Sequence, residues 1–425
     1  MHNILLLDFA SEMNRGDAAM QEAILDIVED VYPNAEKSIV SVYGENQETA
    51  FKDHFDCSAL HDVDIYPGVR NSFNPLSSQF KNLGNKKLRS LFGILFAYFQ
   101  LVIYFLSLKT IFFGPGKRAL SKIASADAVL WNGRNFRNRN GIGEIYDMFA
   151  MLLHPFYCLV LKKKTYAIGV SIWPLRYAIS RIMLRFVLSR CVYVTARESY
   201  SLEYAQKKLG LKNVKLAPDL SFYFINKYRN EDDIARDPKL VSFTLVDWKE
   251  SGLIARQRYK DSIAALMKHL LCAGYRVQVV PQVYYEWEGY VGLLSEIYQE
   301  HPDLNGKLIE IKSYLSPKEL FAEYRKSACL IATRMHSAIF ALTHMCKVIC
   351  VPYDAGAKWH IVSDMGLDAK YMINYSEIAP KVLVDAFENI INDNGLHDKI
   401  VENLPALISG SSSPIEGVLK SSEAQ

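Results

Sequence analysis

Short apolar runs alternate with segments of helical periodicity along nearly the whole chain, and this alternation constrains the fold more than any other feature. Runs of this kind are typical of strands that are buried on both faces of a sheet. They lie at 3–8, 38–43, 128–131, 165–169, 192–195, 240–246, 277–281, 307–311, 328–332 and 348–351. Because strands that alternate with helices form parallel sheets with right-handed crossovers, we predict an α/β fold built from Rossmann-like, doubly wound sheets.

The length of the chain and a charged stretch near its middle predict two domains. A chain of 425 residues exceeds what one hydrophobic core usually organises. The charged stretch 227–239 lacks large apolar runs and is predicted to link an N-terminal domain, 1–226, to a C-terminal domain, 240–408. Residues 409–425 are small and polar, which predicts a loose tail. Open α/β sheets bind ligands at the carboxyl ends of their strands, so the loops of both domains are expected to face a shared cleft.

The net charge of +3 is unevenly distributed, and one region of the chain is strongly basic. Between 81 and 190 the chain carries 18 Lys and Arg residues against three acidic ones, a balance of +15. Such a region favours an anionic partner, which could be a nucleic acid, a membrane surface or a phosphate-bearing substrate.

Within this region, the uncharged apolar segment 91–108 is long enough to cross a bilayer. Strands are predicted both before it and after it. If they join one sheet, a single crossing would place parts of that sheet on opposite sides of the membrane, so a span is disfavoured. Two alternatives remain open: a core helix, or a helix that lies on the membrane surface with its basic flanks on anionic lipid.

Cysteine usage and the N-terminus indicate a cytoplasmic protein. The seven cysteines are scattered and odd in number, with no spacing typical of disulfide frameworks or metal sites. The first strand begins within three residues of the N-terminus, without the basic and apolar regions of a signal peptide.

The segment 328–345 is a candidate anion-binding site. Its strand–turn–helix pattern places Arg334, His336 and Ser337 at a helix start, where free backbone N–H groups and the helix dipole attract anions. Arg334 adds a forked cation, and His336 adds a group that exchanges protons near neutral pH. In the alternative interpretation, Thr333 or Ser337 caps the helix, Arg334 pairs with a surface carboxylate and His336 is packed. We favour the anion site, which suits a small phosphorylated or carboxylated substrate.

Polar residues follow two other predicted strands. Asn14, Gly16 and Asp17 lie at the start of the first helix, where Asp17 is either the N-cap or part of a binding loop. Arg197 opens another helix and either pairs with a neighbouring glutamate such as Glu198 or points into the cleft. The chain has no G-x-G-x-x-G motif after its first strand, so a nicotinamide-binding site has little support.

Taken in order, these motifs resemble the polysaccharide pyruvyl transferase family over about 3–374. The resemblance rests on Asn14-x-Gly16-Asp17, Val194-Thr195-Ala196-Arg197-Glu198-x-x-Ser201, Pro218-Asp219, Pro281-Gln282, Arg334-Met335-His336-Ser337, and Tyr353-Asp354 with Lys358. It implies a two-domain fold like that of GT-B glycosyltransferases. It also implies transfer of the pyruvyl unit of phosphoenolpyruvate to a sugar, usually as a cyclic ketal, with no metal and no organic cofactor.

The chain departs from the family pattern at two places. The family usually has a glycine-rich turn after the strand at 128–131, where this chain has Asn132-Gly133-Arg134-Asn135. An acidic residue commonly follows the Pro-Gln pair, and here the candidates are Glu286 and Glu288. Both departures fall on the expected acceptor side.

The resemblance and the chemistry of phosphoenolpyruvate together suggest roles for these residues. Phosphoenolpyruvate is a small trianion that needs cations and N–H donors. We expect Arg334, Arg197, the helix start at Ser337 and Lys358 to bind it, and His336 to act as the general acid and base. Asp17 or Glu286 is expected to act as base toward the sugar hydroxyls, with Asn14, Gly16, Asn132 and Tyr353 as further substrate-binding residues.

The expected partners are phosphoenolpyruvate and a sugar acceptor, not nucleic acid. The basic region and the apolar segment 91–108 suggest that the acceptor is carried on a lipid diphosphate and that the protein contacts the inner face of an anionic membrane. Two other functions remain open, because fold does not determine function: a nucleotide-sugar glycosyltransferase, and a non-catalytic, membrane-associated carbohydrate-binding protein.

Overall fold

The structure is a computed structural model in which two compact units can be distinguished. It describes residues 3–44, 52–69, 95, 98, 99, 102, 116–133, 135–139, 143–229, 234–248, 251–285, 290–354 and 356–421. Unit 1 comprises Met1–Glu12, Gln21–Pro218 and Ser412–Gln425, and unit 2 comprises Met13–Met20 and Asp219–Ser411. The division falls at Pro218, ahead of the boundary at 226 that the sequence suggests, because helix α8 (Ser221–Tyr228) belongs to unit 2.

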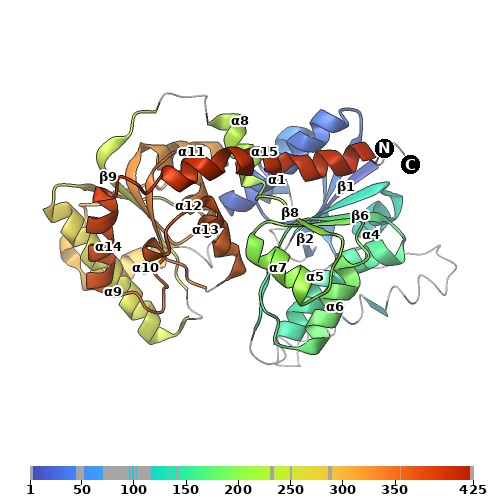
Figure 1. Ribbon diagram of the computed structural model, residues 1–425, viewed down its shortest axis with the longest axis horizontal. Helices are drawn as coiled ribbons and strands as arrows, with labels where there is room; N and C mark the ends of the chain where they lie inside the picture. The colour runs from blue at the N-terminus through green and yellow to red at the C-terminus, as the bar shows by residue number, and fades with distance from the viewer. Residues whose placement is uncertain are drawn as a thin grey trace. The chain divides into compact units, whose positions relative to one another are not determined.

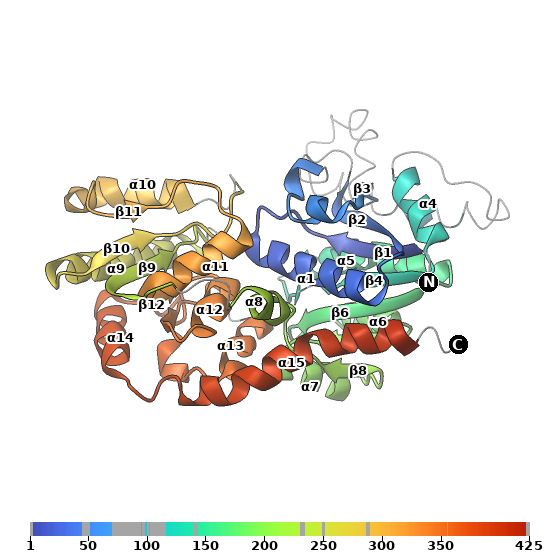
Figure 2. The ribbon, with the colours of Figure 1, turned by 90° about the horizontal axis from the view of Figure 1, so that it is seen from above.

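Unit 1 is built on a parallel sheet with the strand order β3-β2-β1-β4-β6-β7-β8 (Figures 1 and 2). A short strand, β5, lies off this path and pairs with β6. The strands are β1 (Asn3–Phe9), β2 (Glu36–Gly44), β3 (Asp64–Gly68), β4 (Ala128–Asn132), β5 (Asn135–Phe136), β6 (Lys164–Ile172), β7 (Tyr193–Ala196) and β8 (Val214–Leu216). The sheet confirms the predicted strands and their parallel pairing.

Helices connect these strands, and α4 with the two 3-10 turns was not predicted from the sequence. They are α1 (Arg15–Val31), the 3-10 turns η2 (Lys52–His54) and η3 (Ser58–His61), α4 (Lys117–Ser125), α5 (Gly143–Val160), α6 (Ala178–Leu188) and α7 (Ser199–Lys207). The core between sheet and helices is apolar, and Trp131 and Tyr157 are among its largest fully buried side chains. Only the later residues of α1 belong to unit 1, because its first turns belong to unit 2.

Unit 2 has a second parallel sheet with the order β11-β10-β9-β12-β13. Its strands are β9 (Asp237–Thr244), β10 (Arg276–Val279), β11 (Ile309–Glu310), β12 (Ser327–Ala332) and β13 (Lys347–Cys350). Its helices are α8, α9 (Leu253–Cys272), α10 (Tyr290–Glu300), η6 (Pro302–Leu304), α11 (Pro317–Lys326), α12 (Met335–Leu342), η7 (Ala357–Trp359), α13 (His360–Met365), η8 (Ala369–Tyr371) and α14 (Pro380–Asn392). The predicted capping box of Ser316 and Glu319 is present at the start of α11.

Strand β12 and helix α12 lie inside unit 2 rather than on its surface. Every residue of both elements is buried, and β12 is paired on both sides, with β9 and β13. A strand and helix of this kind have no solvent face, which explains why their sequence is continuously apolar. The turn between them is consequently held by the core on all sides.

Two local predictions are wrong. Helix α1 begins at Arg15 rather than Asp17, so Asp17 lies in the first turn and is not the N-cap. Helix α15 (Asp398–Ser421) occupies most of the segment predicted to be a loose tail. That helix buries Ser411 and Ile415, which lie one turn apart. Because helices in proteins are stabilised mainly by the packing of one face, these contacts explain why a polar segment is helical.

Most of the apolar segment 91–108 lies outside the described residues. The two alternatives predicted for it, a core helix and a helix on the membrane surface, therefore both stay predictions. Leu95, Tyr98, Phe99 and Val102 are described, and all four are helical. Among the residues that the structure describes, no helix is long and apolar enough to cross a membrane.

Candidate functional site

The turn between β12 and α12 is held by a set of hydroxyl hydrogen bonds. The Thr333 N–H donates to Thr244 Oγ1 at 3.1 Å, and the Thr333 hydroxyl donates to the Thr244 carbonyl at 2.5 Å. The Ser337 hydroxyl donates to the Arg334 carbonyl at 2.6 Å. Arg334 occupies the N-cap position and its side chain makes no capping hydrogen bond. Thr333 and Ser337 therefore brace the turn, and neither caps the helix as the alternative interpretation required.

His336 is packed between a glycine and a carboxylate. A Cβ atom built on Gly16 would lie 1.9 Å from His336 Nδ1, so any larger residue at position 16 would displace the imidazole ring. On the other side, His336 Nε2 lies 3.8 Å from Asp219 Oδ1, and Asp219 is fully buried. His336 Nε2 is buried and has no hydrogen-bond partner among the described residues. Most buried polar atoms in folded proteins have a hydrogen-bond partner.

The start of α1 reaches this histidine because it is tied to the loop after β10. Asn14 forms an antiparallel bridge with Val283, and the Arg15 N–H donates to the Gln282 carbonyl at 3.2 Å. Asn14 Oδ1 accepts a hydrogen bond from the Gly16 N–H at 3.2 Å, so Asn14 takes the capping role predicted for Asp17. The predicted residues Asn14, Gly16 and Asp17 thus lie in unit 2, in the same unit as Arg334 and His336.

Arg15, which sequence reasoning missed, lies between Asn14 and Gly16 at the start of α1. Its side chain is fully buried, and its guanidinium carbon lies 3.8 Å from the ring centroid of Tyr314 and 5.5 Å from that of Tyr284. Stacking of this kind stabilises a buried cation. The available signal was an arginine between two motif residues, Asn14 and Gly16, at the end of an apolar strand.

Tyr353 connects the two predicted cations. The guanidinium carbon of Arg334 lies 5.7 Å from the Tyr353 ring centroid, and Lys358 Nζ lies 4.5 Å from it. Lys358 Nζ donates to the Tyr353 hydroxyl at 2.8 Å and lies 3.3 Å from Asp354 Oδ2. The Trp248 ring packs against Tyr353 with centroids 4.7 Å apart. The cluster thus combines two cations, an aromatic platform and a histidine within one compact unit.

Two further predicted substrate-binding residues are Arg197 and Asn132. Both belong to unit 1, where Arg197 Nε donates to Ser171 Oγ at 2.7 Å and lies 3.7 Å from Glu198 Oε2. The structure therefore supports the local pairing of Arg197 with Glu198. Asn132 is buried at the end of β4. Glu286 and Glu288 lie outside the described residues.

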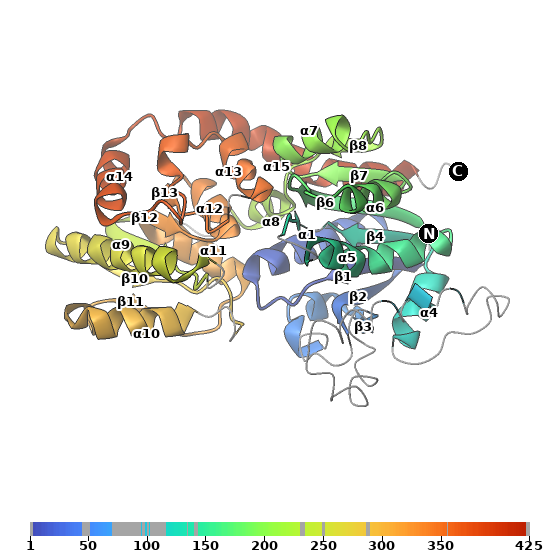
Figure 3. The same ribbon diagram turned by 90° about the horizontal axis from the view of Figure 1, so that it is seen from below.

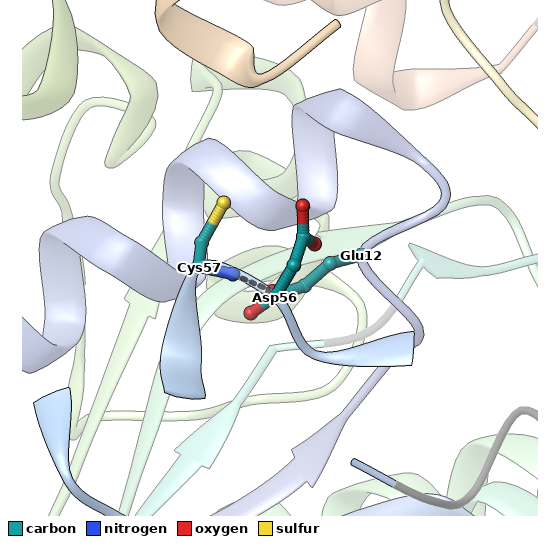
Figure 4. Close-up of side chains that lie close together, drawn as sticks. All are labelled: Glu12, Asp56 and Cys57. Carbon is teal, nitrogen blue, oxygen red and sulfur yellow. Dashed lines mark hydrogen bonds between the residues drawn. The ribbon is translucent and has the colours of Figure 1, made fainter. Parts of the chain in front are cut away.

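A second group of ligand-type side chains lies in unit 1, where Glu12, Asp56 and Cys57 approach one another (Figure 4). The Glu12 carboxylate accepts hydrogen bonds from the Cys57 N–H at 2.7 Å, from the Ser58 N–H at 3.2 Å and from Gln21 Nε2 at 3.3 Å. Burial raises the pKa of Glu12 to about 8. Because the carboxylate oxygens are already engaged by N–H donors, this group anchors the chain around η3 and makes a poor metal site.

Comparison with known proteins identifies the family. The family model for polysaccharide pyruvyl transferase matches residues 14–355. The chain belongs to the polysaccharide pyruvyl transferase family. The match includes the start of α1, the β12–α12 turn and Tyr353. The chain is also similar to the amylovoran biosynthesis protein AmsJ of Erwinia amylovora, with 22% identity over 253 residues. That match spans 55% of this chain and only 58% of AmsJ.

Solved structures share the fold at very low identity. A proposed UDP-N-acetylglucosamine 2-epimerase from Listeria monocytogenes superposes with a TM-score of 0.61 and 8% identity, covering 97% of this chain and 94% of its own. The UDP-GlcNAc 2-epimerase of Neisseria meningitidis gives 0.59 at 9% identity, covering 99% and 100%. A glycosyltransferase of kitacinnamycin gives 0.56 at 9% identity, covering 99% and 98%. These likenesses confirm the predicted GT-B-like α/β fold with parallel sheets.

Proposed function

We propose that this protein transfers the pyruvyl group of phosphoenolpyruvate to a sugar of a surface-polysaccharide precursor, forming a pyruvate ketal and releasing phosphate. One observation supports the proposal most: motif residues from separate parts of the chain meet near the β12–α12 turn of unit 2, where Arg334 and Lys358 flank Tyr353 and His336 packs on Gly16. No metal and no organic cofactor takes part in the proposed reaction.

The binding of phosphoenolpyruvate is assigned to unit 2. Arg334 offers a forked pair of donors that suits a carboxylate or a phosphate, and Lys358 offers a point charge. The start of α12 adds backbone N–H groups and the positive end of the helix dipole, since the Arg334 side chain makes no capping hydrogen bond there. We place Arg197 outside this assignment, because its guanidinium is held by Ser171 and Glu198.

The proposed reaction needs two proton movements and one leaving group. A proton is added to the methylene carbon of phosphoenolpyruvate, one sugar hydroxyl attacks the neighbouring carbon, and the bond from that carbon to the phosphate oxygen breaks. A second hydroxyl of the same sugar then closes the ketal. Of the two hydroxyl protons, one replaces the proton given to carbon and the other leaves on phosphate.

His336 is assigned the proton transfer to and from the donor, and Asp219 Oδ1 lies 3.8 Å from its Nε2 atom. Asp17 or Glu286 is the proposed base toward the sugar hydroxyls, and Asn14 and Asn132 are proposed to bind substrate. We expect His336→Ala to keep the thermal unfolding profile of the parent while its turnover falls by at least about tenfold, since general acid–base catalysis contributes about 10²–10⁴ in rate. Unchanged turnover in the folded variant would remove His336 from the mechanism.

The acceptor is proposed to be carried on a lipid diphosphate at the inner face of the cytoplasmic membrane, with peripheral contact between protein and lipid. The net charge of +15 over 81–190 and the apolar character of 91–108 support this assignment. A soluble acceptor that is pyruvylated as fast as the lipid-linked one would contradict it.

A nucleotide-sugar glycosyltransferase is the second candidate, because the fold resembles that of a glycosyltransferase and of UDP-sugar epimerases. Calorimetric titration separates the two functions. Phosphoenolpyruvate is expected to bind the parent saturably, to bind Arg334→Ala at least about tenfold more weakly because a charge-assisted bidentate contact is lost, and to bind Arg258→Ala normally. Arg258 is a matched control, because its side chain bonds the Ser376 carbonyl.

The possible results of this titration point in different directions. Binding of a uridine or guanosine diphosphate sugar in place of phosphoenolpyruvate would overturn the pyruvyl transfer and favour the glycosyltransferase. Binding of a glycan without turnover, together with indifference to phosphoenolpyruvate, would favour a non-catalytic carbohydrate-binding protein.

A further inference from the structure

Helix α6 exposes a ridge of large apolar side chains. Ile179, Ile182 and Phe186 are 44%, 61% and 41% exposed. Their spacing of three and four residues places them on one face of the helix, while Leu184, Val187 and Leu188 of the opposite face are buried in the core of unit 1. An apolar face of this kind on an otherwise well-packed helix indicates a surface that contacts something apolar.

The chain around this ridge is rich in basic residues. The buried Glu144 carboxylate accepts hydrogen bonds from the Arg176 and Tyr177 N–H groups just before α6. From Met148 to Arg197 the sequence contains no Asp or Glu, yet it contains eight Lys and Arg residues. Arg185 and Arg190 lie within or just after α6 and are exposed. The Arg190 guanidinium carbon lies 3.7 Å from the Phe186 ring centroid, and Arg190 Nη1 donates to the Phe186 carbonyl at 2.9 Å. The apolar side chains and the cations are therefore parts of one surface.

The same surface continues onto neighbouring elements of unit 1. Helices α5 and α6 pack side by side (Figures 1 and 3). The Phe186 ring lies 6.3 Å from that of Phe156 on α5, and Phe156 lies 5.4 Å from Tyr98. Close to Tyr98 in the chain, Phe99 and Val102 are 52% and 51% exposed. The apolar surface thus extends from α6 toward the described residues of 91–108.

The combination of an apolar ridge with flanking arginines discriminates between partners. Aromatic residues and arginine also occur at protein interfaces, so the charge of the region is what favours an anionic surface: eight Lys and Arg residues and no Asp or Glu between Met148 and Arg197. A surface for nucleic acid would not need exposed isoleucines. An apolar strip that inserts among acyl chains, with cations at the level of the headgroups, is what an anionic bilayer requires. Arginine stacked on an aromatic ring, as Arg190 is on Phe186, keeps its charge at the surface while its stem covers apolar area.

We propose that the exposed face of α6, centred on Ile182 and Phe186 and flanked by Arg185 and Arg190, docks unit 1 on an anionic lipid bilayer. This inference deepens the proposed function by naming the surface that makes the membrane contact. It rests on the proposed function only for the identity of the lipid-linked acceptor. The docking face lies on an element separate from the residues assigned to phosphoenolpyruvate, so it can be altered without touching them.

Vesicle flotation tests the docking face. The full chain is mixed with vesicles of equal parts phosphatidylcholine and phosphatidylglycerol, and separately with vesicles of phosphatidylcholine alone. We expect the parent to float with the anionic vesicles, to float poorly with the neutral ones, and to be released as the salt concentration rises. Ile182→Asp and Arg185→Glu are each expected to weaken binding by at least about tenfold, because each places a negative charge at an anionic surface.

Val291→Asp is the matched control, since Val291 is 66% exposed on α10 in the other unit; it is expected to float like the parent. Thermal unfolding of Ile182→Asp is expected to match that of the parent, which checks that unit 1 of the variant is folded. Its calorimetric binding of phosphoenolpyruvate is expected to be unchanged, which separates a failure of the docking face from a failure of the proposed function. Flotation of Ile182→Asp equal to that of the parent, or a parent that does not float, would overturn the proposal. A change in the oligomeric state of Ile182→Asp without loss of flotation would instead assign the ridge to a protein contact.

Discussion

At the scale of single residues, Gly16 positions the ring of His336, a residue far away in the sequence, because it leaves space for that ring. Its peptide lies so close to His336 that a methyl group would overlap the imidazole, with contacts of 1.9 Å to Nδ1 and 2.3 Å to Cγ. Glycine is needed at this position for space, because its φ angle is one that other residues also adopt. Gly16 holds the ring by contact, and Asp219 faces the ring from the other side.

We expect Gly16→Ala to lower turnover by at least about tenfold and to destabilise the fold by about 1–3 kcal/mol, because the added methyl group overpacks a buried ring. Steady-state phosphate release and thermal unfolding measure the two effects. Gly292→Ala is the control, since a Cβ there meets nothing within 4 Å and alanine is favoured over glycine inside a helix. A Gly16→Ala enzyme as active as the Gly292→Ala enzyme would show that the position of His336 is not critical.

His344 couples stability to pH. Burial, with smaller contributions from Arg325, Arg236 and Arg229, lowers the pKa of His344 to about 3, and its ring packs 4.4 Å from that of Phe321. As pH falls below the ordinary histidine value of about 6.5, the unfolded chain binds a proton that the folded protein does not bind. Stability is therefore complete above about pH 6.5 and is lost progressively toward pH 3.

Between pH 7 and pH 5, His344 is expected to cost about 1 kcal/mol of unfolding free energy, after the full shift is discounted for the half-buried position of the ring. His344→Phe keeps an aromatic ring against Phe321 and removes the titration, so its stability should fall less over the same interval. Urea unfolding of both proteins at the two pH values measures the difference. Parallel pH dependence in both would contradict the assignment.

At the scale of elements, the sequence predicts most strands and their parallel pairing, because apolar runs buried on both faces of a parallel sheet are easily recognised. It misses the short strands β3, β5 and β8 and does not predict the order of the strands within each sheet. Helix starts and the terminal segment were less predictable. Helix α1 begins at Arg15 because Asn14 is bridged to Val283, a contact between residues that are distant in the chain. Similarly, the packing of His336 on Gly16 joins two motifs that sequence reasoning could place only in order along the chain.

Helix α15 offers a direct test of the segment predicted to be a tail. Ile415 is fully buried, whereas Val401 in the same helix is 56% exposed. Ile415→Ala is expected to destabilise the protein by about 2–5 kcal/mol through loss of buried contacts and a cavity, and Val401→Ala is expected to change stability by less than about 0.5 kcal/mol. Equal unfolding midpoints for the two variants would restore the original prediction of a loose tail.

At the scale of the whole molecule, the division into two compact units has a thermodynamic consequence. Each unit has its own sheet and core, and multidomain chains commonly unfold in more than one transition. All the residues assigned to phosphoenolpyruvate lie in unit 2. A ligand stabilises the folded form of what it binds, by about 2.7 kcal/mol at one hundred times its Kd. Phosphoenolpyruvate should therefore act on one transition only.

Scanning calorimetry with and without phosphoenolpyruvate tests this expectation, and two core variants identify the transitions. Leu266→Ala, in α9 of unit 2, and Leu152→Ala, in α5 of unit 1, each remove a fully buried side chain and should each lower one transition, since such changes cost about 2–5 kcal/mol. We expect phosphoenolpyruvate to raise the transition that Leu266→Ala lowers and to leave the other in place. A shift of the Leu152→Ala transition alone would assign the donor to unit 1, where Arg197 and Asn132 lie, and would contradict the site at the β12–α12 turn. A single transition that phosphoenolpyruvate raises would show that the two units unfold together, so that binding in either stabilises both.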